Sequence, residues 1–242
     1  MQLPKSSEVF SKVSWFDEID STNLELARQV EAGAQDFSAV IAASQTSGQG
    51  RLGRNWSSPP GASLSLSILV PKTFPEPGWL TLLAALSVKR ALEELGVVEP
   101  GIKWPNDLHV QGRKVCGILA QLLPSGEVVV GIGLNLKAQH PELNAISLEE
   151  LGVNADIDTA AAAIGKELAG LLKAFFTSPN EVKLQFSSSC ITLGEQVRAE
   201  LPGGQELRGL AAEVDHRGQL VILTPEPVAL SAGDVWHLRA DR

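Results

Sequence analysis

Cysteine, methionine, tyrosine and long apolar runs are scarce in this chain. Among its 242 residues there are two cysteines, one methionine and no tyrosine. Cys116 and Cys190 lie in apolar sequence without a cysteine or histidine at metal-site spacing, so we expect two buried, reduced thiols. No apolar run approaches the roughly 20 residues that cross a bilayer, and the first residues do not resemble a signal peptide. These absences predict a cytoplasmic protein with no membrane partner.

Histidine and positive charge are also limited. The four histidines are scattered along the chain and support neither a zinc cluster nor a histidine-based triad. The metal that we expect is Mg²⁺ carried with a nucleotide. The net charge of −8 argues against broad binding to nucleic acid. The remaining composition, 44% hydrophobic and 20% charged, is that of an ordinary globular protein.

Apolar periodicity predicts helices and strands along most of the chain. The first helix should begin with Ser21 or Thr22 as its cap and end at Ala32, before Gly33. The other expected helices cover residues 79–95, 159–176 and 179–188, and the helix over 159–176 should have Asp158 as its cap. The expected strands cover residues 38–44, 63–68 (half-exposed), 102–110, 113–123 and 127–137, the last three forming an antiparallel meander.

The pattern changes near residue 190. Short apolar-alternating runs follow over residues 196–201, 207–214, 219–223 and 235–238, separated by glycine- and proline-containing turns. Such runs are typical of a small β-barrel. We therefore expect two domains, residues 1–189 and residues 190–242.

The loop over residues 45–62 is the most informative segment. Its 18 residues exceed the roughly 12–15 beyond which structureless loops are usually functional. It contains Arg51, Arg54 and four glycines but no acidic residue, so it could close around an anion. It is not a Walker A loop, because no Gly-Lys-Ser/Thr follows. The alternative is a solvated loop, in which Trp56 would be exposed without a reason.

The strand expected over residues 127–137 has one apolar face and one bare face. The bare face carries Gly131 and Gly133, with Asn135 in line beyond them. Interior glycines usually mark close approach of a ligand or of another backbone. We expect a flat ligand on this strip, with a tight helix contact as the alternative.

Two neighbouring strands bring polar groups to the same sheet. Residues 103–107 interrupt one of them, where Pro105 removes a hydrogen-bond donor. Lys114 and Gly117 fall on opposite faces of a regular strand. Both can meet one ligand only if Lys114 lies in the turn or the strand bulges. Each lysine alone would more often be a solvated charge.

Five motifs in order resemble the biotin–protein ligases over almost the whole chain. They are Ser21-Thr22-Asn23 and the segments 45–56, 103–107, 114–119 and 131–135. The resemblance implies an α+β fold of the class II synthetase-like type: a mixed, largely antiparallel sheet with helices on one face, plus an SH3-like β-barrel. It also implies formation of biotinyl-5′-AMP from biotin and ATP, and transfer of biotin to a lysine of a biotin carboxyl carrier protein, such as that of acetyl-CoA carboxylase.

The resemblance also implies which residues hold biotin and ATP. They are Ser21, Thr22, Asn23, Gln45, Gly48, Gln49, Gly50, Arg51, Arg54, Trp56, Lys103, Asn106, Lys114, Gly117, Gly133 and Asn135. Ser21, Thr22 and Gln45 match residues that hydrogen-bond the biotin ureido group, and the glycines match the loop and the backbone around biotin. Trp56 matches the aromatic ring packed against adenine, and Asn106 and Asn135 match polar contacts to the adenylate.

The implied catalytic residues are Arg51, Lys114 and Asp107. The two cations match groups near the biotin carboxylate and the α-phosphate, and Asp107 is the expected Mg²⁺ ligand. One departure from the family is Gln49, where the loop commonly has arginine. If that arginine acts through its main chain, little changes; if its charge holds the loop closed, adenylate affinity should fall.

Several alternatives stay open. A lipoate–protein ligase would share the fold and the acyl-adenylate chemistry, although the loop and residues 103–107 favour biotin. A biotin-binding regulator without ligase activity is another. Some relatives begin with a DNA-binding domain, but here the first motif starts at Ser21, so we expect no binding to DNA. The sheet edge could form a homodimer, and the C-terminal barrel could contact ATP or the carrier.

Overall fold

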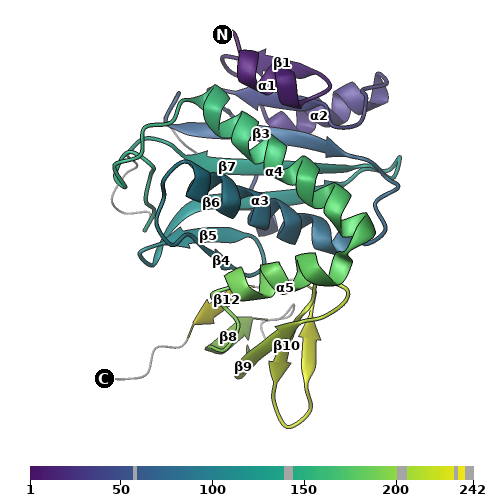
Figure 1. Ribbon diagram of the computed structural model, residues 1–242, viewed down its shortest axis with the longest axis vertical. Coiled ribbons are helices and arrows are strands. Elements are labelled where there is room, and N and C mark those ends of the chain that lie inside the picture. The colour runs from purple at the N-terminus through teal and green to yellow at the C-terminus, as the bar shows by residue number, and fades with distance from the viewer. Residues whose placement is uncertain (57–58, 139–143, 201–205, 232–233, 238–242) are drawn as a thin grey trace.

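A seven-stranded sheet forms the larger part of the molecule (Figure 1). The structure is a computed structural model that describes residues 1–56, 59–138, 144–200, 206–231 and 234–237. The strand order is β1-β2-β3-β7-β6-β5-β4. The strands are β1 (Val13–Phe16), β2 (Ala39–Ala42), β3 (Ser63–Val70), β4 (Gly101–Lys103), β5 (Asp107–Val110), β6 (Arg113–Leu122) and β7 (Val128–Asn135). β1 and β2 pair in parallel and the other neighbours are antiparallel, which confirms the mixed, largely antiparallel sheet.

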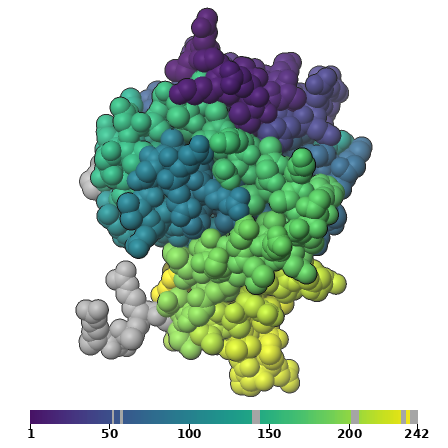
Figure 2. Space-filling view, viewed as in Figure 1, coloured from purple at the N-terminus to yellow at the C-terminus, as the bar shows by residue number. Residues whose placement is uncertain are grey.

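Helices cover one face of this sheet. They are α1 (Pro4–Val9), α3 (Leu80–Glu94), α4 (Ile157–Thr177) and α5 (Pro179–Ser189), and α3 and α4 cross in front of the strands in Figure 1. Figure 2 shows the side chains of α3, α4 and α5 closing over this face. Their apolar residues form the main core with the strands beneath them. No described helix combines the length and the apolar character that a membrane span requires.

One helix lies on the opposite face. It is α2 (Thr22–Glu31), whose Leu26 packs with Val40, Leu69 and Val129 in a smaller core. Ser21 occupies the expected cap position, and Gly33 follows the helix with φ +85°. Two short 3₁₀ helices, η1 (Arg51–Gly53) and η2 (Pro77–Trp79), complete this part of the chain.

The C-terminal strands form a separate antiparallel sheet, seen at the bottom of Figure 1. Its order is β11-β10-β9-β8-β12. The strands are β8 (Gln196–Glu200), β9 (Glu206–Val214), β10 (Leu220–Leu223), β11 (Val228–Leu230) and β12 (Asp234–His237). The predicted small β-domain is thereby confirmed, although residues 201 and 238 of the expected strands lie outside the described residues. The boundary at 189/190 stays a prediction; α5 ends at Ser189 and β8 begins at Gln196.

The prediction that Asp158 caps α4 is wrong. The cap is Asp156, whose side chain accepts a hydrogen bond from Thr159 N at 2.6 Å. Asp158 instead accepts from the backbone amides of Lys5 and Ser6, at 3.0 and 2.8 Å. Both aspartates suit a cap position. The hydrogen bond between Ser6 and Asp158, which are 152 positions apart in the sequence, decides which of them caps the helix. The carboxylate of Asp158 therefore satisfies backbone amides in the first turn of α1, a helix that was not predicted.

The expected strand over residues 102–110 is in fact two strands. β4 and β5 pair antiparallel, with Lys103 opposite Asp107. Trp104, Pro105 and Asn106 form the turn between them. The polar interruption noted in the sequence is therefore a reversal of the chain, and it presents its side chains at the end of a hairpin.

Candidate active site

A row of five residues crosses the sheet on the face opposite α3 and α4. Ser65 of β3 pairs with Gly133 of β7, and Gly133 pairs with Gly117 of β6. Gly117 pairs with Asp107 of β5, which pairs with Lys103 of β4. Two glycines thus lie at the centre of the row, with polar side chains on both sides. At Gly133 the row crosses the bare strip that the sequence predicts along β7, and it extends over β3, β7, β6, β5 and β4.

A cavity of about 270 Å³ lies over this row. It is enclosed by the start of α2, the loop that follows β2, the β4–β5 turn, the glycines of β6 and β7, and β12. The predicted residues that line it are Ser21, Thr22, Asn23, Gln45, Gln49, Gly50, Arg51, Arg54, Trp56, Lys103, Asn106, Asp107, Lys114, Gly117 and Gly133. The structure therefore brings together residues that are more than 110 positions apart in the sequence.

Gly48 and Asn135 support the cavity from outside its lining. A Cβ on Gly48 would lie 2.4 Å from the carbonyl oxygen of Trp56, so the glycine allows the loop to close on itself. Asn135 is buried, and its Nδ2 donates to Lys114 O at 3.3 Å and to Ile146 O at 3.2 Å. These bonds hold Asn135 against the backbone around the site, and its contact with the adenylate stays a prediction.

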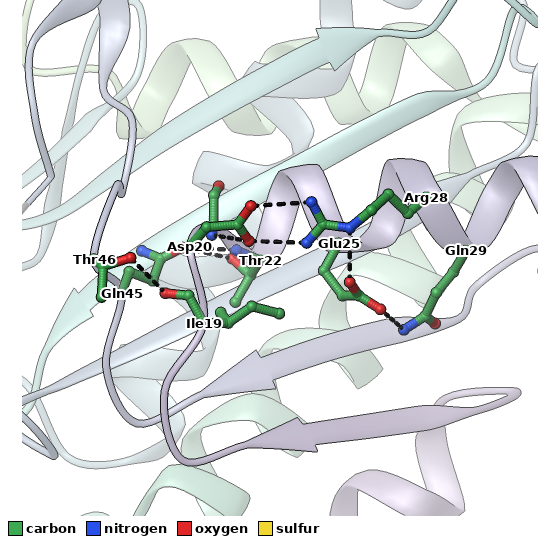
Figure 3. Close-up of polar contacts among 9 residues, drawn as sticks. Ile19, Asp20, Thr22, Glu25, Arg28, Gln29, Gln45 and Thr46 are labelled. Atoms are coloured by element: carbon green, nitrogen blue, oxygen red, sulfur yellow. Dashed lines mark hydrogen bonds and ion pairs between the residues drawn. The ribbon is translucent and has the colours of Figure 1, made fainter.

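One end of the cavity is a network of uncharged polar groups. Gln45 Oε1 accepts hydrogen bonds from Thr22 N at 2.8 Å and from Thr22 Oγ1 at 3.1 Å (Figure 3). Ser67 Oγ lies 2.8 Å from Thr22 Oγ1 and 2.6 Å from Asn23 Oδ1. A Cβ on Gly131 would lie 2.4 Å from Asn23 Oδ1, so this glycine makes room for the network. The end can both donate and accept hydrogen bonds.

The prediction that residues 63–68 form a half-exposed strand is wrong. All of β3 is buried, including Ser63, Ser65 and Ser67. The serine face is covered because α2 packs against β3 and the cavity residues lie beside it. Ser65 lines the cavity, and Ser67 joins its polar end. Neither was predicted as a site residue.

An ion-pair cluster holds the start of α2 in place (Figure 3). Arg28 donates to both carboxylate oxygens of Asp20, at 3.0 and 2.8 Å, and to Glu25 at 3.0 Å. Asp20 also accepts from Ser21 N at 2.7 Å. The Arg28 hydrogen bond, followed by that of the Ser21 amide, lowers the pKa of Asp20 to about 2. The cluster therefore restrains Ser21 and Thr22 at the cavity.

A bulge in β6 brings Lys114 to the glycine row. Leu108 pairs with Cys116, whereas the next residue, His109, pairs with Lys114, so Val115 is the extra residue. Lys114 Nζ consequently lies 3.0 Å from where a Cβ on Gly117 would be. Of the two arrangements that residue parity allowed, a turn or a bulge, the structure has the bulge. Lys114 and Gly117 face the same cavity.

Lys114 is paired with Asp107. Its Nζ lies 2.6 Å from Asp107 Oδ1 and 5.9 Å from the centroid of the Trp56 ring. Asp107 Oδ1 is buried and makes this ion pair, but it accepts no hydrogen bond from the described residues. Asp107 also lines the cavity.

Trp56 covers the two central glycines. A Cβ on Gly133 would lie 2.4 Å from its Cε2, and one on Gly117 would lie 3.3 Å from its Cζ3. Its Nε1 is buried and donates to no described residue. Trp56 is therefore not an exposed loop aromatic, and a ligand that carries an acceptor would satisfy its indole nitrogen.

The cavity is electropositive, although the chain is acidic. The lining residues that the structure describes include four cations, Arg51, Arg54, Lys103 and Lys114, and one carboxylate, Asp107. Arg51 Nη1 donates to Asn106 Oδ1 at 2.9 Å, and Asn106 Nδ2 donates to Ile118 O at 3.0 Å. The loop is thereby joined to the β4–β5 turn. An anionic ligand suits this arrangement.

The C-terminal domain supplies lining residues that were not predicted. Val235 and Trp236 of β12 line the cavity. The Arg198 guanidinium of β8 lies 4.5 Å from the centroid of the Trp236 ring. Alternation along β12 indicates a strand, but which of its faces meets the cavity depends on how the two sheets pack. No local signal in the sequence carries that information.

This chain is similar to known proteins. Residues 15–136 match the Biotin/lipoate A/B protein ligase family, and residues 192–238 match the Biotin protein ligase C terminal domain. The chain is 37% identical to the biotin–[acetyl-CoA-carboxylase] ligase of Mycobacterium tuberculosis, over 90% of this chain and 86% of that protein.

Two solved structures resemble it over almost their whole length. The biotin protein ligase from Aquifex aeolicus in complex with biotin and ATP has a TM-score of 0.83 and 31% identity, covering 95% of this chain and 100% of that one. The ligase from Leishmania major in complex with biotinyl-5-AMP has a TM-score of 0.67 and 26% identity, covering 95% and 99%.

Proposed function

Because this chain belongs to the biotin/lipoate A/B protein ligase family, we propose that the cavity over the glycine row is where it activates and transfers biotin. The chain is a biotin–protein ligase, which forms biotinyl-5′-AMP from biotin and ATP and transfers the biotin to a carboxylase. The observation that supports the site is the glycine floor, with uncharged polar groups at one end and four cations around it. The roles of individual residues follow from this floor.

The polar end suits the biotin ureido group. That group offers two N–H donors and one carbonyl acceptor, so it needs both kinds of partner. Thr22 donates two hydrogen bonds to Gln45 Oε1 there, and Ser21 also lines the cavity. The bicyclic ring would then lie beside Gly131 and Gly133, over which Asn23 and Trp56 pack in this structure.

The first chemical step joins two anions. An oxygen of the biotin carboxylate attacks the α-phosphorus of ATP, forming a carbonyl–oxygen–phosphorus anhydride. The bond from the α-phosphorus to the bridging oxygen breaks, and pyrophosphate departs. Arg51 and Lys114 would reduce the repulsion between the reactants and stabilise the charge of the transition state. Arg54 and Lys103 add positive charge to the same cavity.

The residues present fit a magnesium ion carried with the nucleotide. Mg²⁺ commonly binds one or two carboxylates together with substrate phosphates. Asp107 is the one carboxylate in the described lining, and its Oδ1 retains bonding capacity. Asp107 would therefore hold the ion, which would neutralise phosphate charge when bound.

The second step transfers the acyl group. The amine of a carrier lysine attacks the anhydride carbonyl, a nitrogen–carbon bond forms, and AMP leaves with the electrons of the broken carbon–oxygen bond. Asp107 would orient this amine or accept its proton. The loop over residues 45–62 would keep water from the anhydride. The partner is the carrier domain of a biotin-dependent carboxylase. The buried, unpaired cysteines agree with a cytoplasmic location.

We also propose that Gln49 changes adenylate binding little. Its backbone forms a bridge with Asn55, and Gly50 N donates to Arg54 O at 2.6 Å. These bonds shape the loop through its main chain. A side chain other than arginine at position 49 is compatible with that geometry.

Biotin-dependent exchange of pyrophosphate into ATP tests the assignment. We expect Lys114→Ala and Arg51→Ala each to lower the exchange rate by about a hundredfold, because each removes a charge aimed at the transition state. Lys166→Ala on the exposed side of α4 is the control and should be neutral. Full activity in the first two variants would contradict their roles. Exchange supported by lipoate rather than biotin would favour the alternative ligase, and a carrier left unlabelled would favour a regulator.

A further inference from the structure

The β4–β5 turn is held by the segment that leads into the C-terminal domain. Trp104 N donates to Thr192 Oγ1 at 3.0 Å, and Trp104 Nε1 donates to Gly218 O at 3.2 Å. Ile191 N donates to Ile102 O at 2.9 Å, beside a parallel bridge from Ile102 to Cys190. The chain after α5 therefore runs along β4 and fixes the turn that presents Lys103 and Asn106.

Thr192 has a second partner, on β12. Its side chain is fully buried, and Oγ1 lies 3.2 Å from His237 Nε2. His237 ends β12 and directly follows Trp236, which lines the cavity. Burial, with the positive charge of Lys103, lowers the pKa of His237, so its ring is neutral at pH 7.

One hydroxyl thus serves two elements. It accepts the hydrogen bond of the Trp104 amide, which leaves its own proton for an acceptor. In the neutral ring protonated at Nδ1, His237 Nε2 is that acceptor. The β4–β5 turn and β12 meet the cavity from different domains, and this hydroxyl joins them.

We propose that Thr192 and His237 are positioning residues for adenylate formation. They fix the β4–β5 turn and Trp236 of β12 relative to each other where both line the cavity. Neither is among the described lining residues, so they act through Lys103, Asn106 and Trp236. The proposal rests on the proposed function, because it concerns the rate of that reaction.

The two ends of the cavity should respond differently. Thr192 and His237 contact the end formed by the β4–β5 turn and β12. The polar end formed by Thr22 and Gln45 belongs to α2 and the following loop. Loss of the shared hydroxyl should therefore affect ATP and leave biotin binding nearly unchanged. A purely structural role would lower stability and affect both substrates alike.

The test is biotin-dependent pyrophosphate exchange by the full chain, with ATP and biotin varied in turn. Thr192→Val keeps the shape but removes both hydrogen bonds. We expect kcat/KM for ATP to fall about tenfold and KM for biotin to change less than about twofold. Thr192→Ser, which keeps the hydroxyl, should stay within about threefold of wild type. Ser87→Ala, which removes another buried hydroxyl, is the stability control.

His237 provides a second, matched pair. Gln can place an acceptor near the position of Nε2, whereas Leu cannot. We expect His237→Gln to remain near wild type, and His237→Leu to show part of the loss of Thr192→Val, because it breaks one of the two hydrogen bonds of the hydroxyl. The double variant of Thr192→Val and His237→Leu should be no worse than Thr192→Val alone, because that variant already breaks both. If Thr192→Val does not fold, the comparison of His237→Gln with His237→Leu still tests the positioning role.

Three results would overturn the proposal. They are a kcat/KM for ATP in Thr192→Val within about twofold of wild type, equal losses for ATP and biotin, and additive effects in the double variant. A wild-type protein without biotin-dependent exchange would overturn the proposed function as well. An active wild type with an unaffected Thr192→Val overturns only the positioning role.

Discussion

The two faces of the main sheet are built from the same strands but differ in chemistry. Towards α3 and α4, β7 presents Val130 and Leu134, which are fully buried in the main core. Towards the cavity it presents Gly131 and Gly133, where Asn23 and Trp56 occupy the space that side chains would fill. Because side chains alternate along a strand, each face can serve a separate role. A change on one face should affect stability, and a change on the other should affect catalysis.

The largest effect is expected from Gly133→Val. Even a Cβ at this position would lie 2.4 Å from Trp56, and the branched side chain would occupy the ligand floor. We expect biotin-dependent pyrophosphate exchange to fall about a thousandfold, equivalent to roughly 4 kcal/mol. The unfolding midpoint, measured by thermal denaturation, should change much less. An active Gly133→Val variant would show that the ligand lies elsewhere.

The neighbouring residue should give the opposite result. Leu134 is fully buried against the main core and pairs with Leu64 and Cys116. Leu134→Ala should lower the unfolding free energy by about 3 kcal/mol, through lost burial and the cavity left behind. Urea denaturation measures this loss. Exchange activity per folded molecule should stay near wild type at low temperature. A selective loss of activity would contradict the assignment of this face of the sheet to stability alone.

Ser67→Ala should have an intermediate effect on the polar end. It removes the hydroxyl shared by Thr22 and Asn23, so that buried acceptors lose a donor. We expect KM for biotin to rise about fivefold and the unfolding free energy to fall by about 1 kcal/mol. Ser87→Ala on α3, equally buried, should cost comparable stability and leave KM for biotin unchanged. Equal KM values in the two variants would contradict the role of Ser67.

The smallest effect concerns His109, which lies beside Lys114 in the β5–β6 register. Burial, then the charge of Lys103, lowers the pKa of His109 from 6.5 to about 4. The unfolded chain therefore takes up a proton first as pH falls. This contribution to stability is complete above pH 6.5 and is lost as the pH falls towards 4.

His109→Gln should accordingly reduce the slope of unfolding free energy against pH between about 6.5 and 4. Guanidinium denaturation at several pH values measures the slope. Part of the slope should remain in this variant, because the pKa of His237 is lowered as well. His216→Gln, an exposed control, should leave the slope as it is. An unchanged slope in His109→Gln would mean that the ring titrates normally.

Much of the fold follows from local patterns. The alternation over residues 127–137 predicted β7 and its two faces, and the parity of Lys114 and Gly117 predicted that the two could meet one ligand only through a turn or a bulge, of which the structure has the bulge. Both inferences rest on strand geometry, which is a property of neighbouring residues. The errors came where two local solutions were equally good. Asp156 and Asp158 both suit a helix cap, and only the position of α1 separates them.

The site was predictable where its residues form short motifs, as at Lys103 and Asn106 or in the loop around Arg51. It was not predictable where burial decides the role. Ser65 and Ser67 form a polar strand face, which usually meets solvent. Here α2 and the cavity cover that face. Trp236 reaches the cavity only because the C-terminal sheet packs beside the β4–β5 turn.

Local sequence was enough to predict the strand and helix periods, the glycines of β7 and the cationic loop, because each depends on residues close together in the chain. The packing of distant segments sets which polar groups are buried, which carboxylate caps which helix, and how Thr192 and His237 meet. These outcomes depend on contacts between residues far apart in the chain, and the free energy of a buried polar group depends on whether such a partner is present.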